Sequence, residues 1–430
     1  MAGIRSGAMK HSLFLLLVSS INVFADGVLT LTKAYELALT NYPGYRVEML
    51  KTQAVGETIE QAKSRLYPKI DITASGGKYS YETYYTPTET SEIYKTYSLS
   101  LTQPLFRPEL WRTLDQTKTR YDTSNRELEK QAQQVGSDVI KTYMQMLQTQ
   151  ANIDKLQSQK ELYETKYRKS IEMITMGLSN SIELLEAKVN KEKAIIDLLA
   201  KEREYQALKN KLERLTKTKF DSIVAYNEEQ KYLMSKEEWM NRLQGNKDIQ
   251  IARLSKKSAE DEVAIRRYDH YPKADLNLGR SQNFTNDPVA HKYDNKALVQ
   301  LSIPIYQGGY TSSRVQEAVL LLNAAESNEE LAQLQIRDKF EELWTQRESL
   351  YESITVLKQA IASSKMFLKS VESGYLKGIK NQLDVMDAEL KMKSVESELN
   401  VSLCDMMINE IGLLDLSGQL TVDQLSAYTK

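Results

Sequence analysis

Few side chains in this sequence have the types and spacing that catalysis requires. The three histidines, His11, His270 and His291, are widely separated, so they predict neither a metal cluster nor a histidine-based triad. The one cysteine, Cys404, cannot form a disulfide within the chain. Gly308-Gly309 follows a predicted strand but lacks the continuation of a phosphate-binding loop. We therefore expect no enzymatic activity, no cofactor and no bound metal.

One charged stretch, residues 374–389, could act through its electric field rather than through covalent chemistry. Asp384 and Asp387 are three residues apart and would share one face of a helix. Two carboxylates on one face concentrate negative charge. On spacing alone, a pair of solvated surface charges is the simpler interpretation of both aspartates.

The same stretch interrupts a long helical pattern around Gly378, and an earlier segment repeats it. Residues 177–187 are a degenerate copy that aligns with residues 378–388 position for position, without a gap. Glycine permits the positive φ that ends a helix, and the small polar residues that follow can cap the next helix. We therefore predict two helical hairpins, with Gly177 and Leu178 at one tip and Gly378 and Ile379 at the other.

The arms of these hairpins carry a heptad-like apolar stripe. Residues from about 109 to 172 and from about 311 to 373 keep an unbroken helical pattern in which apolar positions recur at spacings of three and four. Neighbouring apolar positions widen the stripe, so each helix should pack on more than one partner. Periodicity alone leaves an ordinary coiled coil as an alternative. The stripe includes Val135, Val139, Thr142, Met146, Thr149 and Ile153 in the first arm, and Ile336, Phe340, Leu343, Leu350, Ile354 and Leu357 in the second.

Two proline-bounded regions, 67–106 and 271–309, alternate apolar and polar residues as strands do. Each predicted strand has about ten residues, a length that crosses a bilayer at a tilt. Polar loops are expected near residues 82–92 and 285–295. A small soluble hairpin domain is the alternative, and four strands in a membrane would require the chain to oligomerise. Tyrosines gather at the predicted rim as in an aromatic girdle, at Tyr79, Tyr81, Tyr84, Tyr85, Tyr94 and Tyr97.

The first 25 residues have the pattern of a signal peptide. Lys10 precedes a short apolar run at residues 13–18, and Ala25 provides a small residue at the expected cleavage site. An N-terminal membrane anchor is the alternative, but the run is shorter than the roughly 20 residues that a spanning helix needs. The 57 basic and 58 acidic residues give a net charge of −1, which predicts no nucleic-acid partner.

The repeated features divide the chain into two halves. Tyr67-Pro68-Lys69 corresponds to Tyr271-Pro272-Lys273, and Gly177 corresponds to Gly378. Each half should contain a helix, a β-hairpin and a long helical hairpin. The predicted segments are a signal peptide (1–25), a first repeat (26–215), a connector (216–235), a second repeat (236–415) and a polar C-terminal tail (416–430).

The order and duplication of these motifs resemble the TolC family of outer-membrane efflux proteins, over essentially the whole chain after residue 25. The resemblance rests on residues 38–43, the two Tyr-Pro pairs, residues 103–106 and the tip at 374–388. It implies a fold that is mainly α with β. Three protomers would each give four strands to one outer-membrane β-barrel, continuous with a long α-helical barrel. The chain departs from the family pattern at Tyr42, which separates Asn41 from Pro43, and near residues 245–248, where the proline is lacking.

The resemblance also implies a function and partners. The chain would be the outer-membrane exit duct of a tripartite efflux pump or a type I secretion system in a Gram-negative bacterium, with its helical part in the periplasm. It would form a homotrimer in outer-membrane lipid and meet a periplasmic adaptor and an inner-membrane transporter. The alternative is a secreted structural or adhesive coiled-coil protein with small β modules. Detergent-dependent extraction and channel conductance would separate the two.

Specific residues at the tips acquire roles through the same resemblance. Asp384 and Asp387 match the paired aspartates that form acidic rings at the periplasmic constriction of TolC-like tunnels. Tyr375 and Lys380 match a tyrosine and an arginine whose links to the neighbouring coil keep the entrance closed, although lysine lacks the bidentate fork of arginine. Glu183 stands where the family has the acidic partner of that basic residue. The residues expected to dock the adaptor are Gly177, Leu178, Gly378 and Ile379.

Overall fold

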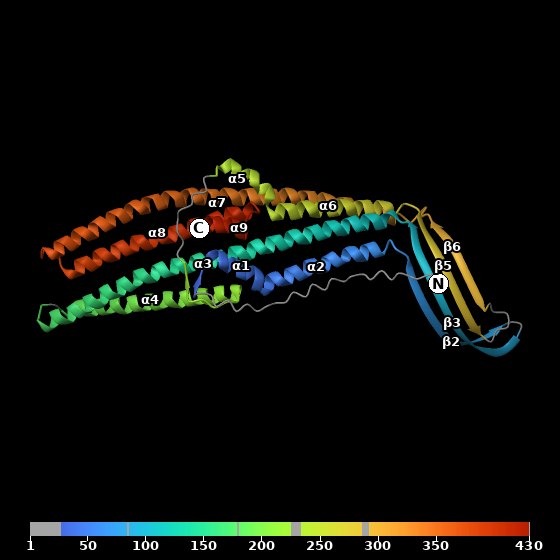
Figure 1. Ribbon diagram of the computed structural model, residues 1–430, viewed down its shortest axis with the longest axis horizontal. Helices are drawn as coiled ribbons and strands as arrows, with labels where there is room; N and C mark the ends of the chain where they lie inside the picture. Colours follow the sequence, from blue (N-terminus) through green and yellow to red (C-terminus); the bar gives the residue numbers. More distant parts are fainter. Residues whose placement is uncertain (1–26, 84–85, 179, 225–233, 286–291, 430) are drawn as a thin grey trace, which may run out of the picture.

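The computed structural model describes residues 27–83, 86–178, 180–224, 234–285 and 292–429. The predicted signal peptide, residues 1–25, lies outside this part of the chain. A long bundle of helices occupies most of the molecule, and a four-stranded sheet projects from one end of it (Figure 1). Within the described residues, no helix combines the length and the apolar character needed to cross a membrane.

In the residues that the structure describes, the first half of the bundle contains four helices. The helices α1 (Leu31–Asn41) and α2 (Pro43–Ser64) lead to the sheet, α3 (Pro108–Thr175) returns from it, and α4 (Ser181–Thr216) follows the first tip. The second half contains α5 (Lys236–Arg242), the short 3₁₀ helix η1 (Leu243–Gly245), α6 (Lys247–Tyr268), α7 (Tyr310–Leu376), α8 (Gln382–Leu416) and α9 (Val422–Thr429). The predicted long helices are confirmed, since α3 has 68 residues and α7 has 67. At 1.5 Å per residue each is roughly 100 Å long.

Burial of the heptad-like stripe differs between the two long helices. On α3, which packs against α4, α6 and α8, the six named stripe positions are all buried. On α7, whose main partners are α6 and α8, Ile336, Phe340 and Ile354 are buried while Leu343 and Leu350 are half-buried. The stripe therefore identifies the packed face correctly. How deeply it is buried in one chain depends on the number of neighbouring helices.

The apolar core lies midway along the bundle, where α1, α3, α8 and α9 meet. Tyr143 on α3 is buried there, and its hydroxyl lies 2.9 Å from the Leu29 carbonyl oxygen and accepts a hydrogen bond from the Val224 N–H. Residues 28–29 (β1) and 222–223 (β4) form a short parallel pair beside this tyrosine. The first part of the predicted connector, 216–235, is therefore packed against the core.

The prediction of a polar tail at residues 416–430 is wrong, because apolar residues of this segment are buried. The segment turns at Gly418 and continues as α9, and the side chains of Leu416, Leu420 and Leu425 are buried in the core. Burying three leucines stabilises the fold by roughly 1.5–3 kcal/mol each, which explains why the segment packs on the bundle instead of extending into solvent. Polar residues between these leucines obscured the pattern in the sequence.

The sheet consists of β2 (Lys69–Thr83), β3 (Thr86–Phe106), β5 (Lys273–Thr285) and β6 (Tyr293–Ser302) in the order β2-β3-β5-β6, with every neighbouring pair antiparallel. The polar loop predicted near residues 82–92 is wrong, because β2 and β3 stay paired as far as Thr83 and Thr86. Threonine is β-branched and favours strands, so the run of threonines extends the hairpin. With 15 and 21 residues, β2 and β3 are longer than the expected ten.

The strand register gives the sheet one apolar and one polar face. The apolar face is formed by the even-numbered residues of β2 and β5 and the odd-numbered residues of β3 and β6, and includes Ile72, Leu99 and Val299. The polar face carries serine, threonine and asparagine side chains that pair across strands, as Thr96 Oγ1 does with Asn283 Oδ1 at 3.0 Å. Tyr97 lies on the apolar face and Tyr94 on the polar face, so these two do not form one girdle. Tyr84 and Tyr85 lie outside the described residues.

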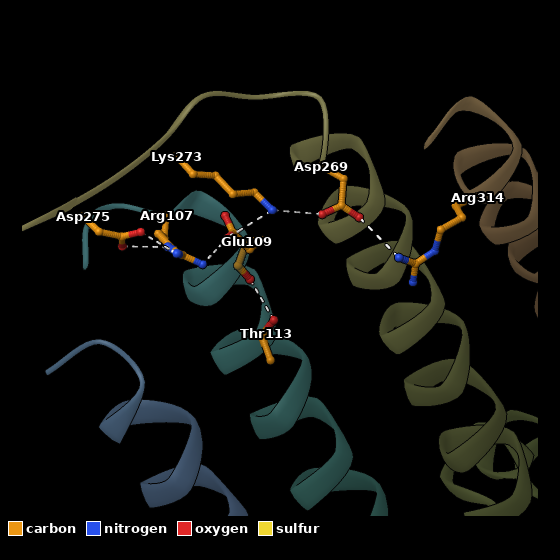
Figure 2. Close-up of polar contacts among 7 residues, drawn as sticks. All are labelled: Arg107, Glu109, Thr113, Asp269, Lys273, Asp275 and Arg314. Carbon is orange, nitrogen blue, oxygen red and sulfur yellow. Dashed lines mark hydrogen bonds and ion pairs between the residues drawn. The ribbon is translucent and has the colours of Figure 1, made fainter. Parts of the chain in front are cut away.

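A charged network joins the sheet to the helices (Figure 2). Arg107, which precedes α3, donates two hydrogen bonds to the Asp275 carboxylate at the start of β5, one of them at 2.9 Å. Glu109 on α3 is only 9% exposed and lies 3.8 Å from Arg107 and 3.6 Å from Lys273. Lys273 in turn pairs with Asp269, which caps the C-terminus of α6. Because the network links residues on three elements, it fixes the base of the sheet relative to the helices.

Candidate functional site at the helical hairpin tips

Both predicted tips lie at the end of the bundle opposite the sheet (Figure 1). At the first tip, Gly177 has φ of +70° and the Leu178 N–H donates to the Met173 carbonyl at 2.8 Å. The Asn180 side chain then accepts hydrogen bonds from the N–H groups of Ile182 and Glu183, both at 3.0 Å. A glycine in the left-handed conformation thus ends α3, and an asparagine cap starts α4.

The second tip has the same backbone arrangement. Gly378 has φ of +70°, and the Ile379 N–H donates to the Gly374 carbonyl at 2.9 Å. A Cβ atom placed on Gly177 or Gly378 would meet nothing within 4 Å. The positive φ alone therefore explains the need for glycine at each tip.

Asp384 belongs to the cap of α8. Its carboxylate accepts a hydrogen bond from the Asn381 N–H at 2.8 Å, while the Asn381 side chain accepts one from the Asp384 N–H at 3.0 Å. This reciprocal arrangement is a capping box, and the negative charge also suits the N-terminus of the helix dipole. Asp384 consequently has a local structural role besides any part in a constriction.

Asp387, one turn further along α8, contacts the other helical hairpin. Its Oδ1 atom lies 3.1 Å from Lys166 Nζ on α3, and the two side chains are 45% and 34% exposed. This ion pair links the two hairpins near their tips and places a positive charge beside one of the two predicted constriction carboxylates.

The predicted latch residues are only partly brought together. Lys380 is 3.8 Å from Asp384 on its own hairpin, and this is the ion pair that the structure shows for it. Within one chain, Lys380 therefore pairs with Asp384, which is close to it in sequence. A contact with Glu183 of the other tip stays a prediction. The Tyr375 side chain is 47% exposed.

The tips also expose large apolar side chains to solvent. Met176 and Leu178 are each 69% exposed at the first tip, and Leu376 and Ile379 are 85% and 76% exposed at the second. Exposed apolar groups grouped at one end of a molecule are typical of a surface that binds another protein.

Sequence reasoning missed Lys166. Its charge was one of many along α3, and nothing local indicated that it would face α8 of the other hairpin. The sequence indicated only that Lys166 lies beside the apolar stripe of α3, and this position does not identify the residue that Lys166 contacts.

Comparison with known proteins agrees with this architecture. The family model described as outer membrane efflux protein matches residues 34–216 and 241–419. Outer membrane protein TolC of Escherichia coli (strain K12) is 23% identical over 440 residues, which cover 97% of this chain and 88% of that protein.

Solved structures have the same fold. The Campylobacter jejuni CmeC outer membrane channel has a TM-score of 0.79 at 16% identity, covering 93% of this chain and 89% of that one. The outer membrane protein VceC of Vibrio cholerae has a TM-score of 0.75 at 16% identity, covering 90% of this chain and 96% of that one. With the family model matching both halves of the chain, this outer membrane protein belongs to the outer membrane efflux protein family.

Proposed function

We propose that three copies of this chain form the exit duct of a tripartite efflux pump or a type I secretion system. Each copy would contribute its four strands to one closed barrel in the outer membrane and its helices to one periplasmic tunnel. The edge strands β2 and β6 each have one neighbour in the sheet. In lipid, their free backbone groups must be paired, and pairing β6 of one copy with β2 of the next would satisfy them.

The apolar face of the sheet is the observation that carries this proposal. Ile72 is 80% exposed, Val299 62% and Leu301 61%, on a sheet that projects beyond the helix ends (Figure 1). In water such a surface would be unfavourable by about 25 cal/mol per Å². Lipid on this face and water on the polar face would suit both sets of side chains, as in a membrane barrel.

The tips would form the periplasmic entrance. Three copies would bring six carboxylates, those of Asp384 and Asp387, around one axis and create a negative field in a narrow passage. Tyr375 and Lys380 would hold the closed entrance through contacts with the neighbouring coil, with Glu183 as the acidic partner of Lys380. Exposed Leu178 and Ile379 next to Gly177 and Gly378 would provide the apolar surface for a periplasmic adaptor, which would connect the duct to an inner-membrane transporter.

Extraction and mass measurement test the assembly. The full-length protein should fractionate with the outer membrane, require detergent for extraction and have the native mass of a trimer. A water-soluble monomer in the periplasmic fraction would contradict the proposal and favour the structural coiled-coil alternative.

A further inference from the structure

Basic side chains share the apolar face of the sheet with its aliphatic residues. Ile70 and Leu101 pair at one level and Ile72 and Leu99 at the next. The same face carries exposed Arg280 at the level of Leu99 and, farther toward the distal end of the sheet, exposed Lys95 and Lys78. By register, Lys95 lies opposite Phe284 and Arg280 lies opposite Leu99.

Aromatic rings lie among these cations. The Arg280 guanidinium carbon is 5.7 Å from the centre of the Tyr293 ring, and Lys292 Nζ is 5.8 Å from the same ring. Tyr97 and Phe284 meet edge to face at 6.0 Å between ring centres. Aromatic rings of this kind are enriched at membrane–water interfaces, and long basic side chains beside them can extend toward charged headgroups.

Among the strand residues whose side chains the structure describes, the acidic residues lie on the opposite face. Where the structure describes side chains, the strand acids Asp71, Asp275 and Asp294 all belong to the polar face by register. None of the ion pairs between described residues involves Lys95 or Arg280. On the polar face, by contrast, Lys69 pairs with Asp71 at 3.0 Å.

We propose that Lys95 and Arg280, with Tyr97, Phe284 and Tyr293 beside them, form a binding site for the phosphates of a lipid headgroup in the outer leaflet. This inference rests on the proposed function, because it requires the apolar face to contact lipid. A phosphorylated lipid fits on two grounds. Its acyl chains would lie along the aliphatic residues nearer the helices, such as Ile70 and Leu101. Its phosphates would meet Lys95 and the Arg280 guanidinium, which extends toward Tyr293, on a face where none of the described side chains is acidic.

A titration of the purified full-length trimer, followed by native mass spectrometry, tests this site. The lipid is diphosphorylated lipid A, compared with its fully dephosphorylated form. The parent should bind the phosphorylated lipid more tightly, and Lys95→Gln with Arg280→Gln should weaken that binding roughly fivefold for each cation removed. The matched control is Lys69→Gln with Lys296→Gln, which removes two charges from the polar face and should leave binding unchanged.

Each other outcome has a definite meaning. Equal binding of the two lipids by the parent, or equal weakening in the control variant, would overturn the site. Displacement of the lipid by an equal concentration of inorganic phosphate would overturn the assignment to a lipid. If the apolar-face variant fails to assemble, the relative binding of the two lipids to the parent still tests whether the site recognises phosphate. A parent that forms no trimer and no conducting channel would contradict the proposed function as well, whereas a conducting trimer without phosphate preference would contradict this inference alone.

Discussion

Lys166 on α3 lies 3.1 Å from Asp387 on α8 and thereby connects the two helical hairpins of one chain. Both side chains are partly exposed, so the pair contributes about 1 kcal/mol or less to stability. Its electrostatic effect is more important for the proposed entrance, because the lysine partly neutralises a carboxylate of the expected acidic ring.

Removing this lysine should strengthen the field of the ring. We expect Lys166→Gln to raise the ratio of cation to anion permeability modestly, since Asp387 would lose its compensating charge. Reversal potentials in a salt gradient measure this ratio. Lys169→Gln, one turn away on α3, is the matched control. A variant at Lys166 that changes selectivity no more than the control would show that Asp387 lies away from the ion path.

A reversed charge at the second tip should open the entrance. Lys380→Glu replaces the proposed attraction to Glu183 with repulsion, and it also brings a second negative charge to Asp384, which now lies 3.8 Å from the lysine. Each exposed link is worth about 1 kcal/mol or less, so single-channel conductance should rise modestly, and further when Tyr375→Phe is added. The matched control is Lys369→Glu, which adds the same negative charge on α7 away from the tip. Conductance unchanged in the double variant would remove the latch assignment.

The tip glycines should be needed for their backbone conformation. Gly177→Val or Gly378→Val forces a β-branched residue to φ near +70°, at a cost of roughly 1–3 kcal/mol for a residue in that region. Adaptor cross-linking and export should fall while the sheet stays folded. Asparagine tolerates the left-handed conformation, so Gly177→Asn and Gly378→Asn should keep most of the activity. If the valine variants cross-link and export as the parent does, the tips are not the docking surface.

Glu410 should make stability depend on pH. It lies on α8, 3.8 Å from Arg347, with a side chain that is 12% exposed, and burial raises its pKa from 4.5 to about 7 despite that arginine. The folded chain therefore binds a proton that the unfolded chain releases. The protonated Glu410 therefore contributes to the stability of the folded state fully below pH 4.5, and this stabilisation is lost as the pH rises to about 7.

Thermal unfolding of Glu410→Gln measures this contribution. The variant should lose the pH dependence in that window and become more stable than the parent above pH 7, by on the order of 1–3 kcal/mol. Glu330→Gln, at an exposed position on α7, should behave as the parent does. A parent and a Glu410→Gln variant with parallel stability profiles would show that this carboxyl is not buried in the assembled protein.

Local signals made the tips and the packed face of α3 predictable. Gly378 ends a helix through its own φ, Asn381 caps the next one through its own side chain, and the heptad spacing identifies buried Val139. Other features depend on which surfaces meet in the folded chain. The pairing of Lys166 with Asp387, the burial of Leu425 and the Arg107–Asp275 link between α3 and the sheet all join segments distant in sequence, and no spacing within either segment indicates them.

Single-channel recording of Asp384→Asn with Asp387→Asn tests the central claim most directly. Asparagine keeps an oxygen that can accept the capping hydrogen bond from the Asn381 N–H, so the change removes charge while α8 stays capped. The parent should conduct as a trimer, prefer cations and be blocked by multivalent cations. The double variant should conduct with reduced cation preference and without that block. A parent that does not conduct, or a double variant with the parent's selectivity and block, would contradict a duct whose entrance is formed by these tips.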